Sequence, residues 1–157
     1  MPAFFLCVVL MQASHGPYYT FLTIHLENLG YPRGTIGLIW ALGVVAEIGV
    51  FMVMARILDR FSLRRVLMFS MLLAAVRWLL MGYLAQELFV LLTAQLLHAA
   101  SFGCFHSAAV HFVQRAFGIR HLGRGQASYA TVSGMGGALG ASMRGTAGAP
   151  WVPAPRS

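Results

Sequence analysis

The 157-residue chain is 59% hydrophobic and only 10% charged, whereas charged residues make up about a quarter of a soluble globular domain. Four acidic residues and eleven arginines, with no lysine, are too few to cover a water-soluble surface. The net charge of +7 does not indicate nucleic-acid binding, because the arginines form short clusters between apolar runs rather than one solvated basic face. These features exclude a soluble enzyme and indicate a helical membrane protein embedded in a lipid bilayer.

Apolar runs of about 20 residues, the length that crosses a bilayer, recur along the chain, and the last is the weakest. They cover approximately residues 3–26, 35–55, 66–85, 88–112 and 126–143, which predicts an all-α membrane protein with about five transmembrane helices. Residues 1–143 are therefore the predicted transmembrane segment, and the Gly-, Ala- and Pro-rich residues 144–157 are a predicted disordered tail. A bundle of paired repeats needs further spans, so a missing half or a second chain is expected as a partner.

The connections between these runs differ in charge. Those at 56–65 and 114–126 hold four and three arginines, whereas those at 27–34 and 86–87 hold two glutamates and one arginine between them. The positive-inside rule therefore predicts that the arginine-rich connections are cytoplasmic and that residues 27–34 are external. The first connection also contains Gly and Pro, which end one helix, and Thr35 is predicted to cap the next.

Three runs carry an ionisable side chain near their middle: Glu47, Arg77 and His98. Such a group costs about 2.5–3.5 kcal/mol at the bilayer centre, so it needs a partner or a water-filled cavity. We expect all three to face a common polar interior, with Glu47 and Arg77 on neighbouring helices. Two interpretations stay open: Glu47 and Arg77 form a structural ion pair, or they belong to a binding site. His98 is likewise either a packing residue or a functional one.

Helical spacing aligns polar and aromatic side chains on one face of each of the first four runs. The faces are Gln12, His15, Tyr19 and Thr23; Trp40, Gly43, Glu47 and Phe51; Ser70, Ala74, Arg77 and Met81; and Gln95, His98, Phe102 and His106. The candidate residues for substrate or proton binding are accordingly Glu47, Arg77, His98, His15, Tyr19, Trp40 and His106. The remaining histidines, His25, His111 and His121, are predicted to be interfacial.

The cysteines and the glycine-rich stretch, which in other proteins can form metal, redox or nucleotide sites, are interpreted here as structural. Cys7 and Cys104 lie inside apolar runs without metal-ligand spacing, so they are predicted to be small membrane-core residues. No catalytic or metal-binding constellation such as His-Glu-x-x-His occurs, and no cofactor is expected. The small-residue spacing of Gly134, Gly136, Gly137 and Gly140 predicts a close helix–helix approach rather than a nucleotide loop.

The connection Ala55–Arg65 resembles the signature loop of the major facilitator superfamily, Gly-x-x-x-Asp-Arg-x-Gly-Arg-Arg. The similarity holds at Asp59, Arg60, Arg64 and Arg65, and the sequence departs from the pattern at Ala55 and Ser62, where the family has glycines. Four longer stretches resemble helices seven to ten of 3-phenylpropionate-transporter-like members, and the likeness extends over about residues 5–141. These stretches are Gln12–Tyr19, Trp40–Glu47, Val76–Trp78 and Gln95–His98.

The resemblance implies helices seven to eleven of the C-terminal half of a proton-coupled transporter in the inner membrane. Its implied substrate is a small organic acid, with aromatic acids among the candidates. The same branch of the family is similar to the lactose/proton symporters, in which a glutamate, an arginine and a histidine bind substrate and protons. Arg77 and His98 fall on matching positions, Glu47 lies about one turn further along, and Ser101 stands where that pattern has a carboxylate. Asp59, Arg60 and Arg64 would form a conformational loop. The alternative is a truncated remnant without transport activity.

Overall fold

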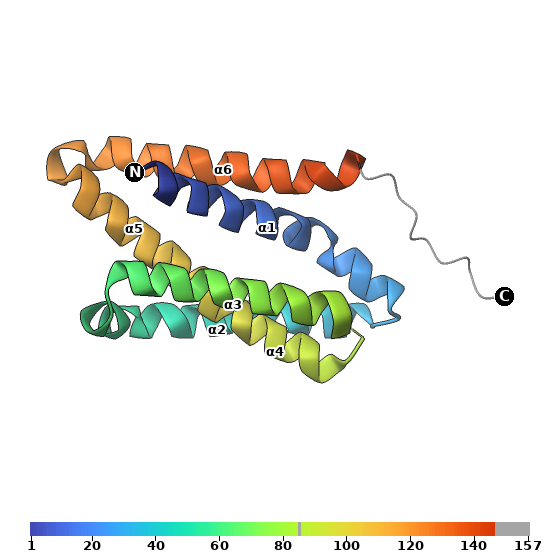
Figure 1. The fold of residues 1–157 in the computed structure, drawn as a ribbon. Coiled ribbons are helices and arrows are strands. Elements are labelled where there is room, and N and C mark those ends of the chain that lie inside the picture. The colour runs from blue at the N-terminus through green and yellow to red at the C-terminus, as the bar shows by residue number, and fades with distance from the viewer. Residues whose placement is uncertain (85, 147–157) are drawn as a thin grey trace. The chain divides into compact units, whose positions relative to one another are not determined.

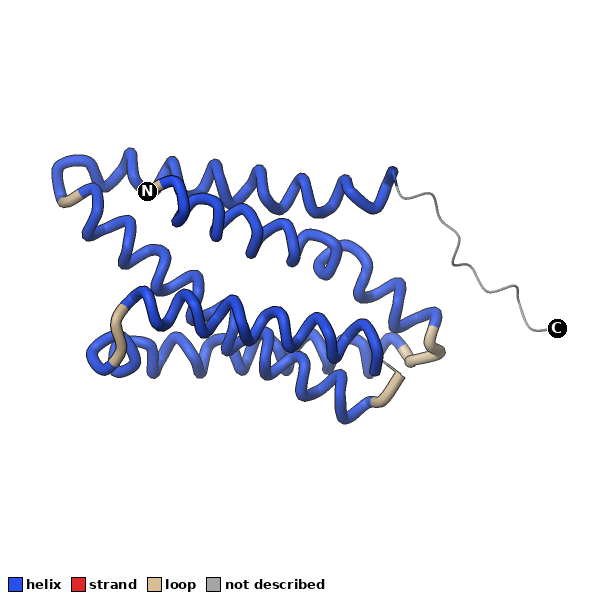
Figure 2. The backbone as a smooth tube through the Cα atoms, viewed as in Figure 1, coloured by secondary structure: helices blue, strands red, loops and turns tan. Residues whose placement is uncertain are grey.

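The structure, a computed structural model, describes residues 1–84 and 86–146, and within these ranges every regular element is a helix. The elements are α1 (Pro2–Asn28), α2 (Arg33–Arg60), α3 (Leu63–Leu84), α4 (Leu88–His98), the π-helical segment η1 (Ala99–Gly103), α5 (Cys104–Phe117), the 3-10 turn η2 (Ile119–His121) and α6 (Leu122–Thr146). Figure 1 shows their order, and Figure 2 shows the short loops that join them. The predicted all-α fold is confirmed. Helix α6 extends to Thr146, and the rest of the predicted tail lies outside the described residues.

Each predicted span lies largely within helix. Among the described residues, three helical stretches are long and apolar enough to cross a membrane: Arg33–Arg60, Leu63–Leu84 and Leu88–Phe117. The third comprises α4, η1 and α5. Helices α1 and α6 have 27 and 25 residues, which is sufficient length, but polar side chains such as Gln12 and His15 lower the hydropathy of α1. Membrane insertion of these two helices stays a prediction.

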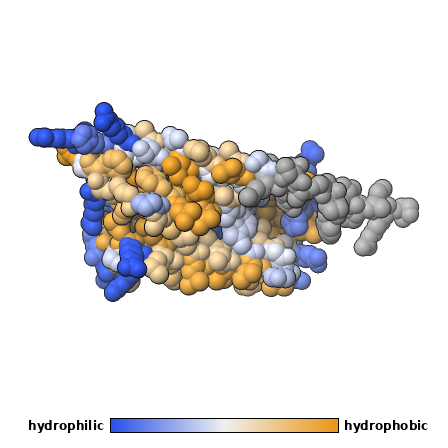
Figure 3. All heavy atoms as spheres, turned by 45° about the horizontal axis from the view of Figure 1, so that its top comes forward, coloured by the Kyte–Doolittle hydropathy of each residue, from blue (hydrophilic) through white to orange (hydrophobic). Residues whose placement is uncertain are grey.

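Apolar side chains are exposed along the middle of the spans. Leu38 and Met52 on α2 and Phe69 on α3 are all more than half exposed. In Figure 3 the orange hydrophobic residues gather over the middle turns of the helices, whereas the blue hydrophilic residues gather at helix ends. Lipid tails are as apolar as these side chains, so the pattern is that of helices with a lipid-facing surface.

The chain divides into two compact units. The larger one is Thr23–Tyr129, and the smaller one combines Met1–Leu22 with the chain from Ala130 onward. The last turn of α1 and the first turns of α6 therefore belong to the larger unit.

Close contact between α1 and α6 characterises the smaller unit. A methyl group placed on Gly136 would lie 2.8 Å from the carbonyl oxygen of Val9, and one on Gly140 would overlap the backbone of Ala13. The predicted close helix–helix approach is therefore confirmed at these two glycines. Gly134 and Gly137 leave open space, because no atom lies within 4 Å of such a methyl group.

In the larger unit, α2 and α3 both pack against the span Leu88–Phe117. The expectation that Glu47 and Arg77 lie on neighbouring helices stays a prediction. An apolar cluster of Met54, Val66 and Ala108 holds the three spans together at one end. Cys104 packs against this cluster as a free thiol, in agreement with its predicted role as a core residue.

At the other end of the larger unit, two connections meet. The hydroxyl of Tyr31, between α1 and α2, donates a hydrogen bond to the carbonyl oxygen of Gln86, between α3 and α4, at 3.1 Å. The prediction that Thr35 caps α2 is wrong, because the helix begins earlier, at Arg33, with Pro32 at the N-cap position. Proline has no backbone N–H to satisfy and a φ near −65°, which suits the start of a helix.

Candidate functional site

Arg77 is the largest fully buried side chain in the described part of the chain. Val66, Ser70, Ala74 and Arg77 follow one another at intervals of three or four residues and form the buried face of α3. The Arg77 side chain is completely buried, and its guanidinium carbon lies 4.1 Å from the ring centre of Trp78. A desolvated cation–π contact stabilises the charge by about 2 kcal/mol, which offsets part of the cost of burial. The arginine is therefore held inside the helix packing, on the face that its spacing predicts.

The span that packs against α3 contributes further buried polar groups. Gln95 and His98 of α4 and Ser101 of η1 are all buried, and the Ser101 hydroxyl donates to the His98 carbonyl oxygen at 3.2 Å. The π-helical segment begins directly after His98. Such segments are frequent at functional sites because they re-aim side chains within a helix. Sequence reasoning missed η1, since hydrophobic periodicity does not distinguish one π turn from an α-helix.

Glu47 lies on α2, half-buried, beside the same span. Two glycines allow this close approach. A methyl group on Gly43 would lie 2.9 Å from the side-chain oxygen of Gln95, and one on Gly103 would lie 3.6 Å from the Cγ atom of Glu47. The methylene stem of Glu47 therefore packs over η1. Glu47 and Arg77 thus come from two helices that share one partner, the span with His98.

A row of aromatic rings follows the face of this span. His98 and Phe102 have ring centres 5.4 Å apart with planes 13° from parallel, and Phe102 and His106 are 6.2 Å apart at 15°. The ring of Tyr129 on α6 is 5.6 Å from that of His106. Its hydroxyl oxygen is 2.9 Å from His106 Nδ1. The predicted alignment of His98, Phe102 and His106 is confirmed, whereas Tyr129 was missed because no local pattern links it to a histidine 23 residues away.

The other candidate residues make separate contacts. Trp40 is half-buried and donates its indole N–H to the Thr23 hydroxyl at 3.1 Å. His15 and Tyr19 belong to the smaller unit, where their ring centres are 6.5 Å apart. His15 is fully buried with Nδ1 2.8 Å from the carbonyl oxygen of Met11. The predicted polar face of α1 and its place in a shared cavity stay predictions.

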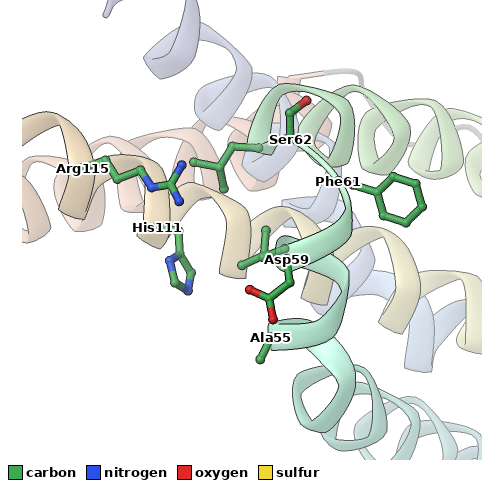
Figure 4. Close-up of a pocket in the computed structure, with 8 residues that line it drawn as sticks. Ala55, Asp59, Phe61, Ser62, His111 and Arg115 are labelled. Atoms are coloured by element: carbon green, nitrogen blue, oxygen red, sulfur yellow. The ribbon is translucent and has the colours of Figure 1, made fainter.

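A cavity of about 220 Å³ lies at the end of the larger unit that carries the signature-like loop. Asp59 from the last turn of α2 and His111 and Arg115 from α5 point toward it (Figure 4). No ion pair joins these three groups in the described part of the chain. Arg60 and Arg64, the other predicted loop residues, are exposed beside it. Opposite charges therefore face one another across a space large enough for several water molecules.

Comparison with known proteins identifies the kind of protein that carries these groups. The MFS_1 like family matches residues 1–151. The chain belongs to the major facilitator superfamily. The buried Arg77 and His98 and the half-buried Glu47 therefore lie in helices of a chain from this superfamily.

One curated relative within the superfamily is close. The chain is 36% identical over 136 residues to the "Probable 3-phenylpropionic acid transporter" of Escherichia coli (strain K12). The matching region is 87% of this chain and 35% of the relative, so the chain spans about a third of that protein's length. No solved structure gives a significant match.

Proposed function

We propose that this chain is part of a proton-coupled transporter that carries a small aromatic organic acid across the inner membrane. It corresponds in this proposal to helices seven to eleven of a C-terminal half, with its arginine-rich connections in the cytoplasm. The other half, or a second chain, supplies the opposite wall of the substrate cavity. Alternating access then arises from rocking of one group of helices against the other around a site near the midplane.

The observation that carries the proposal is the complete burial of Arg77 within a membrane-length helix. Guanidinium binds carboxylate through paired, charge-assisted hydrogen bonds. A buried arginine is a costly feature, and binding an acidic substrate gives it a function. The similarity to a protein named as a 3-phenylpropionic acid transporter supports an acid with an aromatic ring. Arg77 therefore attracts the substrate carboxylate.

Glu47 and His98 are the candidates for proton exchange. The two side chains lie at opposite ends of the π-helical segment: His98 directly precedes it, and the Glu47 side chain packs against Gly103 at its end. Ser101, three residues after His98, has a hydroxyl and no carboxylate, so it does not carry the coupled proton. A carboxylate or an imidazole in a partly dry cavity can bind and release a proton as substrate arrives and leaves. His15, Tyr19, Trp40 and His106 complete the proposed cavity lining.

The signature-like loop has a conformational role in this proposal. Asp59 faces His111 and Arg115 across the cavity at the cytoplasmic end. Closing that space brings opposite charges together, and opening it hydrates them. Arg60 and Arg64 are exposed on the same connection and meet anionic headgroups or the opposite half.

A chimeric transporter tests the proposal. This chain replaces its matching segment in the Escherichia coli relative, and uptake of labelled 3-phenylpropionate is measured in cells that lack the native transporter. Arg77→Ala is expected to lower uptake at least about thirty-fold, because it removes the partner of a buried carboxylate. The matched control is Arg120→Ala, which removes an exposed arginine and should leave uptake unchanged. Normal uptake by a correctly inserted Arg77→Ala variant would contradict the substrate role.

A further inference from the structure

Tyr129 is a buried residue of α6 near the contact between α5 and α6. Its side chain is 5% exposed. One turn earlier, a methyl group on Gly125 would lie 2.8 Å from Val113 and from the ring of Phe117, so the two helices touch closely there. The buried tyrosine thus lies next to a close contact between α5 and α6, and its hydroxyl oxygen is 2.9 Å from Nδ1 of His106.

The chemistry of this pair favours one proton arrangement. A phenol is a better hydrogen-bond donor than acceptor, and the bare nitrogen of a neutral imidazole is a strong acceptor. In the arrangement that this chemistry favours, the hydroxyl of Tyr129 donates to Nδ1 of His106, and the imidazole proton resides on Nε2. Which ring nitrogen of a histidine is protonated is set by the hydrogen bond that the other nitrogen makes.

The second nitrogen of His106 remains available. Within the described part of the chain, Nδ1 takes part in the hydrogen bond to Tyr129, and no hydrogen bond to Nε2 is present. The side chain is only half-buried. Its ring continues the row that begins at His98 and passes through Phe102. The Nε2–H group thus belongs to the helix face that also carries the midplane histidine.

We propose that Tyr129 is a positioning residue of the transport site. It holds His106 in the tautomer that presents Nε2–H, a neutral hydrogen-bond donor, to the carboxylate of the organic acid. This inference rests on the proposed function for its ligand, whereas the tautomer is inferred from the contact between Tyr129 and His106. Through Tyr129, helix α6 also contributes to the proposed transport site.

Nitrogen NMR of the full chain in lipid nanodiscs tests the positioning step without any transport assay. With 15N-labelled histidine, the spectrum distinguishes protonated from bare ring nitrogens, and the His106→Gln variant assigns the His106 signals by their loss. We expect a bare Nδ1 and a protonated Nε2, and Tyr129→Phe should mix the two tautomers. Tyr83→Phe is the matched control, because Tyr83 is 82% exposed. The inferred tautomer is wrong if Nε2 of His106 carries no proton, or if Tyr129→Phe leaves the His106 signals unchanged.

A double-mutant cycle in the chimeric transporter tests the role toward substrate. Loss of the orienting hydrogen bond in Tyr129→Phe should raise KM about five-fold with kcat within about two-fold. In His106→Gln the amide N–H takes the place of Nε2–H and does not depend on the tyrosine. Adding Tyr129→Phe to that variant should therefore change KM by less than about two-fold.

The outcomes separate this inference from the proposed function. An equal rise in KM in both backgrounds, or no rise in either, would assign Tyr129 a packing role and overturn the inference. If the parent chimera transports no organic acid, the proposed function is refuted, and so is the proposal that His106 binds the carboxylate of such an acid. The NMR result still decides in that case whether Tyr129 sets the tautomer.

Discussion

Replacing Gly140 by alanine should weaken the contact between α1 and α6 in the smaller unit. The added methyl group would overlap the carbonyl oxygen of Ala13 and lie 2.7 Å and 2.9 Å from its carbonyl carbon and Cα atom. Carbon atoms in contact are about 3.5–4.0 Å apart, so the helices must separate by roughly 1 Å. The clashing atoms are backbone, which cannot rotate away as a side chain does. Overpacking of this kind costs about 1–3 kcal/mol.

The matched control is Gly134→Ala in the same helix, where no atom lies within 4 Å of the added methyl group. Both substitutions gain the same helix propensity, about 1 kcal/mol, so their difference isolates the clash. In mixed micelles titrated with a denaturing detergent and followed by circular dichroism, Gly140→Ala should be about 2 kcal/mol less stable than Gly134→Ala. Equal stability of the two variants would refute the close approach at Gly140.

Three further results are expected. Single cysteines placed at 56–65 in a background without Cys7 and Cys104 should react with an impermeant thiol reagent only from the cytoplasmic side, and labelling in intact cells would reverse the orientation. The chain alone in liposomes should show no saturable, proton-driven uptake of 3-phenylpropionate, because one group of helices forms one wall of the cavity; clear uptake would refute that architecture. In the chimera, Glu47→Gln should reduce proton-driven accumulation about ten-fold or more while substrate exchange down its gradient changes less. Equal effects on accumulation and on exchange would show that a residue other than Glu47 carries the coupled proton.

The sequence alone predicted the helices and the inward face of α3. Apolar run length is a local property, so each predicted span coincides largely with a helix. The spacing of Ser70, Ala74 and Arg77 follows from 3.6 residues per turn, and all three are buried. The alignment of His98 with His106 was predicted for the same reason, because spacing within one helix needs no knowledge of its neighbours.

Tertiary structure decided which helices meet. The span Leu88–Phe117 lies in contact with both α2 and α3, an arrangement that the sequence did not predict. Periodicity shows which face of a helix is buried, but ridge-into-groove packing with partners distant in the chain determines what covers it. The pairing of Tyr129 with His106 and the close approach of Gly140 to Ala13 have the same origin. Both depend on how closely two helix backbones approach, a quantity that no single helix encodes.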